Sequence, residues 1–534
     1  MSILNRVQIY LRQHGVRYTA KRAAEKVGER VFGTYDRLWR EMTPDAAELA
    51  RQRAQQPRAG LISIVIPVYN TRPELLTALI DSLCAQTYAN WEAILYDGST
   101  REETRAALRA AESRDERLRV TYAEVNEGLA GNTNRGIERA RGEWIALCDH
   151  DDLLTPDALW RIAEAIEREA PDLVYTDEDK ITEDGKRHTD PHFKPDFCPD
   201  NLRSANYVCH FMAIRRTLID QVGGLDPAYD GSQDHDLTLR CTEHTSRIAH
   251  VPFVTYHWRT VGSSMSHQNL DKCLNAACRA VEAHAARIGW PCRATTVNSV
   301  IRLDYEIKGT PKVSVIADHL PKLDWPDIEH VPFQSTGDLM ADMNRSAVKA
   351  TGDVLLFVHP GVQDIQPGFL REMLMYAQRD DVAAVTPVLT DDKGGTTHGG
   401  YVIGGTNGAV CRNAGLRVIN GGWHLLAAQS HNVAAVSAAC FMIRRDHFMP
   451  LNERYQSGLG MVEWCLRLRA KGFVHVYTPH AKAVCTDREL LLLNEKRNAD
   501  DLARLREDWP DLHDPCYSIR CDENKGDFTI KRKD

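Results

Sequence analysis

Three aspartates and a histidine follow an apolar run in the stretch Cys148-Asp149-His150-Asp151-Asp152. Two carboxylates one residue apart, just beyond the end of a strand, can both reach one divalent cation and an adjacent ribose. Oxygen ligands suit Mg²⁺ or Mn²⁺, and either ion would neutralise a diphosphate leaving group. A solvated loop that caps the following helix has the same composition, so the stretch by itself leaves both interpretations open.

Two further acidic stretches carry residue types that suit acid–base or sugar chemistry. The stretch Gly231-Ser-Gln-Asp234-His-Asp236 enters a helical pattern, so Asp234 is either a helix N-cap or a base that takes a proton from a hydroxyl group. The run Asp177-Glu-Asp179-Lys180 either lines a donor or acceptor site or forms a solvated turn. Both alternatives stay open for each stretch.

Strand and helix patterns alternate from residue 61 and must position these acids. Apolar, β-branched runs predict strands at 61–67, 91–96, 117–124 and 143–149, and helical periods predict helices at 75–86, 102–113 and 131–140. This order is typical of a doubly wound parallel α/β sheet, in which ligands bind beyond the carboxyl ends of the strands. The residues just beyond those ends are mostly short, polar or glycine, at 67–70, 97–99, 126–128 and 149–152.

Composition and missing motifs exclude several classes of protein. The chain has 534 residues, 43% of them hydrophobic, which predicts a globular protein of two or more domains. A net charge of -8 gives no support for nucleic-acid binding. Neither GxGxxG after the first strand nor a Walker GxxxxGKS/T pattern is present, so a dinucleotide enzyme and a P-loop NTPase are not supported. The 14 cysteines form no CxxC pair and no run of 18 apolar residues occurs, so we expect a cytoplasmic protein with reduced thiols that does not span a membrane.

The first forty residues are basic and carry apolar side chains, Val7, Leu38 and Trp39 among them, at roughly helical spacing. A basic amphipathic helix can lie on an anionic membrane, which predicts peripheral contact of residues 1–40 with the inner face of the cell membrane. The alternative is a helix packed on the protein's own body. Residues 43–60, polar and rich in alanine, predict a second helix and a linker.

A series of motifs runs from residue 63 to residue 259: SIVIPVYNTRPELL, AQTYANWEAILYDGST, NEGLAGNTNRGI, ARGEWIALCDHDDLL, DLVYTDEDKI, FKPDF, VGGLDPAYDGSQDHDLTLR and VPFVTYHWR. In this order they resemble the bacterial family 2 glycosyltransferases, which have the glycosyltransferase A fold. The resemblance is strongest to the two-domain enzymes that build O-antigen or other surface polysaccharides. It implies transfer of a sugar from a nucleoside-diphosphate sugar to a glycan or a lipid-linked saccharide, with inversion and with a Mg²⁺ or Mn²⁺ ion.

The resemblance also implies roles for individual residues of the first three loops. The positions that hold the donor's nucleobase and ribose match Pro67, Tyr69 and Asp97, and two further donor-binding positions match Asn126 and Asn134. Many relatives have an arginine where this chain has Thr133, and this difference leaves the nucleobase undecided.

The remaining implied roles concern the metal, the diphosphate and the base. The DxD motif that binds ribose and metal matches Asp149 and Asp151. The catalytic base matches Asp234. Contacts to the metal or the diphosphate match His257 and Arg259, and supporting acids beside these groups match Asp152 and Asp236.

The second half of the chain repeats the first. Residues 134–143 align without a gap with 344–353, and 63–66 align with 314–317, which predicts a second domain of the same fold. The acids are missing from it, since Asp149, Asp151, Asp234 and His257 face His359, Gly361, Met461 and Val484. We therefore expect this domain to lack transfer activity and to serve packing, acceptor binding or partner contact. His398, in the glycine-rich segment 394–405, marks either a leftover sugar-binding cleft or a hairpin with tight turns.

The predicted architecture is two tandem α/β domains of the glycosyltransferase A type, the second degenerate, after a helical amino-terminal segment. The boundaries are 1–60 for the basic helical segment, 61–300 for the catalytic domain, 301–490 for the degenerate domain and 491–534 for a helical and polar tail. The predicted function is metal-dependent, inverting sugar transfer in surface polysaccharide biosynthesis. The alternative is a non-catalytic glycan-binding or scaffold protein of the same process.

Overall fold

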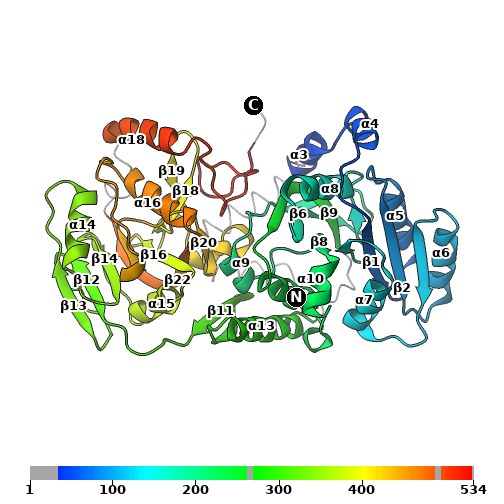
Figure 1. Cartoon of the computed structure of the whole chain (residues 1–534), viewed down its shortest axis with the longest axis horizontal. Coiled ribbons are helices and arrows are strands. Elements are labelled where there is room, and N and C mark those ends of the chain that lie inside the picture. The colour runs from blue at the N-terminus through cyan, green and yellow to red at the C-terminus, as the bar shows by residue number, and fades with distance from the viewer. Residues whose placement is uncertain (1–33, 261–268, 487–494, 532–534) are drawn as a thin grey trace.

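The computed structural model describes residues 34–260, 269–486 and 495–531. Two units, each built on one large sheet, lie side by side along the long axis of the molecule (Figure 1). Helix α13 (Leu270–Arg287) and the hairpin of β10 (Cys292–Val297) and β11 (Val300–Tyr305) connect the first unit to the second. The amphipathic helix expected within residues 1–40 falls largely outside the described residues.

The first sheet has the order β3-β2-β1-β4-β8-β6-β9-β5, with β7 paired to β6. Strands β1 to β4 are parallel, as the sequence predicted, whereas β8 pairs antiparallel with both β4 and β6. Every residue of β1 and β2 is buried, because α5 packs on the face of Ile64 and α7 on the face of Val65. The strands are β1 (Ile62–Val68), β2 (Trp91–Asp97), β3 (Leu118–Tyr122), β4 (Trp144–Leu147), β5 (Leu153–Leu154), β6 (Leu173–Thr182), β7 (His188–His192), β8 (Met212–Arg215) and β9 (Ile248–Thr260). The helices are α5 (Pro73–Cys84), α6 (Glu102–Glu112), α7 (Gly128–Arg139), α8 (Ala158–Glu169), α9 (Pro199–Ser204), α10 (Arg216–Val222) and α11 (Gln233–Thr242).

The second sheet repeats this arrangement strand by strand. Its order is β13-β12-β14-β21-β16-β22-β15, with the same parallel and antiparallel pairings as β2-β1-β4-β8-β6-β9-β5. The strands are β12 (Val313–Ala317), β13 (Ile328–Pro332), β14 (Val354–Val358), β15 (Val362–Gln363), β16 (Val382–Thr390), β17 (Thr396–His398), β18 (Tyr401–Ile403), β19 (Ala409–Cys411), β20 (His431–Val433), β21 (Cys440–Arg444) and β22 (Val474–Cys485). The helices are α14 (Leu339–Lys349), α15 (Phe369–Ala377), α16 (Leu459–Ala470) and α18 (Glu495–Asp508). The chain therefore has two tandem units of one α/β fold.

Hydrogen bonds are repeated along with the strands. The side-chain amide of Asn134 donates to the carbonyl of Leu225 at 2.8 Å and accepts from its N–H at 2.9 Å. In the second unit Asn344 makes the same two bonds with Leu451, at 3.0 and 2.8 Å. Two groups that the sequence aligned thus hold the same loop in both units.

Buried polar side chains join the two units. Arg379, which follows α15, is 1% exposed and is ion-paired with Asp200 of α9. Asp200 also accepts a hydrogen bond from Asn432 of β20 at 2.9 Å. Burial opposes the charge of Asp200, but the guanidinium groups of Arg379 and Arg203 hold its pKa well below the ordinary value. Removing one partner of such a buried pair costs several kcal/mol, so the contact fastens one unit to the other.

Helix α3 (Thr34–Met42) packs on the first unit, and α4 (Ala46–Ala54) follows it with Asp45 as its N-cap. The hydroxyl of Tyr35 donates to Asp179 at 2.9 Å, and the ring of Trp39 stacks on His188 with centroids 4.7 Å apart. For residues 34–42 the structure thus bears out the alternative of a helix packed on the protein's own body.

Two expectations about the whole chain can be compared with the described residues. No helix in the described ranges is both long enough and apolar enough to cross a membrane. All fourteen cysteines lie in the described ranges, and none of them is joined to another in a disulfide.

Candidate active site

The carboxyl ends of β1 and β2 place the first predicted donor-binding residues next to each other. Pro67 is buried within β1, in register with Tyr96 of β2, and Tyr69 just beyond β1 exposes 49% of its surface. Asp97 ends β2, is fully buried and accepts a hydrogen bond from the Ser99 N–H at 3.0 Å. Its second oxygen lies 3.4 Å from Nε of Arg105. An exposed aromatic ring beside a buried carboxylate offers a base a surface to stack on and a polar group to bind.

The loop after β3 is tied to the loop after β2. The exposed Asn126 accepts hydrogen bonds from Asn132 Nδ2 at 2.7 Å and from the Gly128 N–H at 3.1 Å. A Cβ at Gly98 would lie 2.8 Å from Asn132 Nδ2 and 3.1 Å from Asn126 Oδ1, so a larger residue there would have to displace these two side chains. Asn134 lies elsewhere, because both polar groups of its side chain bond to the backbone of Leu225. The structure gives Asn134 a role in the fold and not in a binding site.

The three aspartates beyond β4 differ in their partners. Asp152 is 1% exposed and accepts hydrogen bonds from the Tyr256 hydroxyl at 2.5 Å and the Arg259 N–H at 2.7 Å. Asp149 is exposed and Asp151 is 25% exposed, and Nδ1 of His150 lies 3.8 Å from a carboxylate oxygen of Asp151. Within the described ranges, the carboxylates of Asp149 and Asp151 accept no hydrogen bond from the protein. Two of the three acids are therefore available to a ligand.

These carboxylates also repel one another. Burial, followed by the charges of Asp149 and Asp151, raises the pKa of Asp152 well above its ordinary value. A divalent cation held by the two available acids would relieve this repulsion. The donor set consists of carboxylate oxygens, which are the ligands that Mg²⁺ and Mn²⁺ prefer, so the residues present fit such an ion.

Arg259 and His257 both lie on β9, but their side chains are hydrogen-bonded to different residues. Nε of Arg259 donates to the carbonyl of Asp151 at 2.7 Å, so this arginine holds the acidic loop itself. Its Nη2 is buried without a hydrogen-bond partner in the described residues. His257 bonds through Nδ1 to Asp179 at 2.6 Å, and Asp179 in turn contacts His188 at 3.0 Å.

His257 was expected to share a metal with Asp149 and Asp151. Among the described residues, its ligand atoms group instead with those of Asp179 and His188, all within 4.8 Å of one another. The reason is the register, which places His257 of β9 directly opposite Asp179 of β6, and the ring of His257 also packs edge-on against Trp39 of α3.

The acidic run of residues 177–180 is a buried part of strand β6, so the alternative of a solvated turn is wrong. Asp177 and Asp179 are fully buried and Glu178 is 7% exposed. Each carboxylate is bonded to a histidine, Asp177 to His250 at 2.9 Å and Glu178 to His210 at 2.7 Å. Buried acids persist in a sheet when a partner compensates their charge, and here imidazole rings from neighbouring segments do so.

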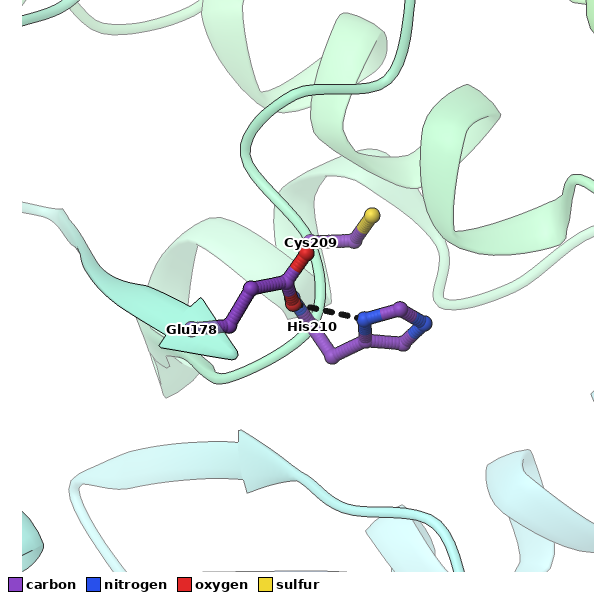
Figure 2. A group of neighbouring side chains, drawn as sticks. All are labelled: Glu178, Cys209 and His210. Atoms are coloured by element: carbon purple, nitrogen blue, oxygen red, sulfur yellow. Dashed lines mark hydrogen bonds and ion pairs between the residues drawn. The ribbon is translucent and has the colours of Figure 1, made fainter. Parts of the chain in front are cut away.

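His210 is the residue that the sequence did not single out. It lies just before β8, and one oxygen of Glu178 accepts both its backbone N–H and its Nδ1 at 2.7 Å (Figure 2). Burial disfavours the imidazolium, but the charges of Glu178, Asp149 and Asp152 raise the pKa of His210 to about 9. Burial raises the pKa of Asp149, and the next largest influence on that pKa is the charge of His210, which lowers it. No spacing rule indicates this contact, because His210 lies far along the chain from both acids.

Asp234 lies in the first turn of α11, and the N-cap is Ser232, so Asp234 does not cap this helix. Its carboxylate accepts a hydrogen bond from Asn206 Nδ2 at 2.8 Å. Burial raises the pKa of Asp149, and the charge of Asp234 is the smallest of the influences that act on it. Asp236 is fully buried and ion-paired with Arg240 at 2.6 Å, as Glu463 is with Arg467 at 2.7 Å in the second unit. That pair belongs to the fold.

At the corresponding strand end of the second unit, the backbone N–H groups of His359 and Gly361 are bonded to acceptors within that unit. The N–H of His359 donates to the carbonyl of Ala439 at 2.9 Å, and the N–H of Gly361 donates to Nδ1 of His359 at 3.1 Å. His398 is fully buried, and burial lowers its pKa to about 3, so it does not line an open cleft. Among the described residues, those that directly follow β14 are His359, Pro360 and Gly361, and none of them is a carboxylate.

Comparison with known proteins agrees with this geometry. Residues 63–223 match the model of glycosyl transferase family 2. The chain is 32% identical to an uncharacterized protein of Sinorhizobium fredii, over 91% of this chain and 60% of that protein. It is also 32% identical to the O-antigen biosynthesis protein RfbC of Myxococcus xanthus, over 84% of this chain and 38% of that protein. A PGL/p-HBAD biosynthesis glycosyltransferase of Mycobacterium bovis is 31% identical, over 37% of this chain and 77% of that enzyme.

The chain thus spans less than two thirds of the length of the first two relatives. The match to the mycobacterial enzyme covers most of that protein, and the family model covers β1 to α10, the strands and loops that carry the available acids. The chain belongs to the family 2 glycosyltransferases.

Proposed function

We propose that the first unit transfers a sugar, with inversion, from a nucleoside-diphosphate sugar to a hydroxyl group of a glycan or a lipid-linked saccharide. The process would be the synthesis of a bacterial surface polysaccharide, because one relative is named for O-antigen biosynthesis. The observation that carries the proposal is the pair Asp149 and Asp151, two carboxylates that accept no hydrogen bond from the described residues at the carboxyl end of β4.

The residues fit a Mg²⁺ or Mn²⁺ ion on Asp149 and Asp151, which when bound would neutralise the diphosphate that leaves the sugar. Arg259 holds the backbone of this loop through the carbonyl of Asp151. Asp97 and Tyr69 are proposed to bind the ribose and the base of the donor. Asn126 fixes the loop that faces them.

Asp234 is proposed to take the proton of the acceptor hydroxyl. Asn206 donates a hydrogen bond to one of its oxygens, which leaves the other for the proton and fixes the direction of the carboxylate. Direct displacement by the acceptor oxygen on the far side of the anomeric carbon inverts that carbon. A single base is sufficient, so no covalent nucleophile is required.

We propose that the second unit, residues 301–490, carries out no transfer of this kind. This is supported by the residues that stand opposite the acids, His359, Gly361 and Met461. Its buried contact with α9 through Arg379 and Asp200 supports a role in holding the first unit.

The test is donor binding followed by transfer. Nucleotide sugars are screened by thermal shift with and without Mn²⁺, and the binding donor is then assayed for hydrolysis or transfer. We expect binding that requires Mn²⁺ or Mg²⁺ and is lost in Asp151→Ala. Metal-independent binding of every nucleotide sugar would count against the proposal.

A second variant separates an enzyme from a non-catalytic glycan-binding or scaffold protein. In Asp234→Asn we expect the transfer rate to fall about 10²- to 10⁴-fold, while donor affinity is retained, because only the proton acceptor is removed. A protein that binds glycans without any transfer in the unmodified chain would favour the scaffold alternative.

A further inference from the structure

His210 has one ring nitrogen that the fold uses and one that it does not. Nδ1 is bonded to Glu178, and the ring is held between the side chains of Tyr256, stacked at 5.6 Å, and Trp258, at 4.6 Å. The other nitrogen, Nε2, points away from Glu178 (Figure 2). It has no hydrogen-bond partner among the described residues, and the side chain is 22% exposed. The ring is therefore oriented for a ligand that the protein itself does not supply.

The surroundings of His210 make it a cation beside the acidic loop. Lys194 lies 4.0 Å from Glu178, and Asp149 and Asp152 act on the ring from the end of β4. The carboxylate of Glu178, 2.7 Å from Nδ1, is the largest influence against the burial of the ring, and this ion pair favours the imidazolium, in which Nε2 carries a hydrogen. A fixed N–H donor with a positive charge suits an anionic oxygen better than a neutral sugar hydroxyl.

The second unit supplies an internal comparison for this residue. Ile145 pairs with Ile214 in the first sheet, as Leu355 pairs with Ile443 in the second, so Ile214 corresponds to Ile443. Four residues before these two lie His210 and Ala439, and Ala439 is therefore the counterpart of His210 in the second unit. In the same way, Glu178 pairs with Tyr256 in the first sheet and Leu389 pairs with Ala483 in the second, so Leu389 is the counterpart of Glu178. The unit that lacks the acids thus also lacks the histidine and its carboxylate, although the strands are the same.

We propose that Nε2–H of His210 binds an oxygen of the donor's diphosphate, as a cationic contact beside Asp149 and Asp151. The inference rests on the proposed function, because it requires a nucleoside-diphosphate donor. Glu178 is the positioning residue, since it fixes both the backbone N–H and the ring of His210. The contact would bind the group that carries the leaving charge and so would favour departure of the diphosphate.

Two other roles for His210 give different results. The ring could serve only to compensate the charge of the acids, in which case it contacts no phosphate. Alternatively, Glu178, Cys209 and His210, whose ligand atoms lie within 4.8 Å of one another, could hold a metal ion. The Sγ of Cys209 is 3.1 Å from the carbonyl of Asn206, and Nδ1 of His210 is bonded to Glu178, so the fold already uses both groups.

The experiment compares diphosphates with monophosphates. Isothermal titration in saturating Mn²⁺ measures the Kd of uridine, guanosine, thymidine and cytidine diphosphates, each with its monophosphate. The proteins are the unmodified chain, His210→Phe, His210→Gln and the neighbouring control Cys209→Ala. The Phe variant keeps an aromatic ring between Tyr256 and Trp258, and the Gln variant keeps an N–H donor without the charge. Circular dichroism and Tm check that each variant is folded.

For the base that binds best, we expect the preference for diphosphate over monophosphate to fall about 10- to 100-fold in His210→Phe, which is the effect of one charge-assisted hydrogen bond. The loss in His210→Gln should be smaller, and Cys209→Ala should stay within about twofold of the unmodified chain.

Four results would overturn the inference. If the unmodified chain prefers a diphosphate and His210→Phe keeps that preference, only the inference fails and the proposed function stands. Equal weakening of both nucleotides assigns the ring to charge compensation. One equivalent of zinc in the purified chain that disappears in Cys209→Ala assigns His210 to a metal. If the unmodified chain binds none of the nucleotides, the proposed function fails and the inference falls with it.

Discussion

The carboxyl ends of β4 and β14 occupy the same place in two sheets of the same strand order, yet they present opposite chemistry. Beyond β4 lie Asp149 and Asp151, which accept no hydrogen bond from the described residues. Beyond β14 lie His359 and Gly361, which are bonded to each other through the Gly361 N–H. Because the sheet forms with either set, the acids of the first unit are not required by the fold.

Other features are kept in both units and therefore belong to the fold. The amides of Asn134 and Asn344 each bind the backbone of a leucine, and the carboxylates of Glu92 and Glu329 each accept a bond from a strand serine. The comparison of the two units separates residues that maintain the fold from residues that bind a ligand, which no inspection of one unit alone achieves.

The largest effect is expected from removing the carboxylate of Asp149 in the first unit, and the matched control removes the side chain of its counterpart His359 in the second. In Asp149→Ala we expect Mn²⁺-stimulated transfer to fall about 10³-fold, because a bound metal contributes several kcal/mol to the stability of the leaving charge. In His359→Ala the transfer rate should stay within about twofold. The measurement is initial rate against Mn²⁺ concentration. A comparable loss in His359→Ala would show that the second edge contributes to the reaction.

A smaller effect is expected from Glu92, which is buried, and its counterpart Glu329, which is half-buried. Burial opposes the charge of Glu92, but hydrogen bonds from Arg141 and Ser63 lower its pKa to about 2. Burial likewise opposes the charge of Glu329, but bonds from Ser314 and Thr351 lower its pKa to about 2. A depressed pKa gives stability that is complete above about pH 4.5 and is lost as the pH falls toward 2.

The exposed fraction of each side chain decides which of the two glutamates contributes more to the free energy of unfolding. The side chain of Glu92 is 2% exposed and that of Glu329 is 23% exposed, so water can replace more of the bonds of Glu329. We expect Glu92→Gln to lower the free energy of unfolding at pH 7 by about 2–3 kcal/mol and Glu329→Gln by about 1 kcal/mol. Urea unfolding followed by tryptophan fluorescence measures both. The difference between each variant and the unmodified chain should shrink at pH 3, and a difference that grows would contradict the assignment.

An effect on stability similar to that of Glu329→Gln, with none on donor binding, is expected from the paired asparagines. Asn134→Ala and Asn344→Ala should each cost about 1–2 kcal/mol of stability, since each leaves the backbone of one leucine without its partner. Donor affinity should be unchanged in both. A tenfold loss of donor affinity in Asn134→Ala, with unaltered stability, would return Asn134 to the binding site that the family resemblance implied.

The sequence by itself determined much of the fold. Runs such as 61–67 and 91–96 are apolar apart from Ser63 and Glu92, because both faces of a central parallel strand are buried, and they became β1 and β2. The gapless alignment of 134–143 with 344–353 determined that a second unit of the same fold exists. Local periodicity and repetition are properties of neighbouring residues, so they can be recognised without the folded chain.

Only the tertiary structure decided the partners of each charged group. Asp149 and Asp152 look alike in the sequence, but Tyr256 and the backbone of Arg259 take up Asp152 and leave Asp149 available. Likewise, His257 is hydrogen-bonded to Asp179, and His210 is hydrogen-bonded to Glu178. These contacts join strands that are distant in sequence, and the alternation of side chains along each strand, with the register of its neighbours, sets which groups meet.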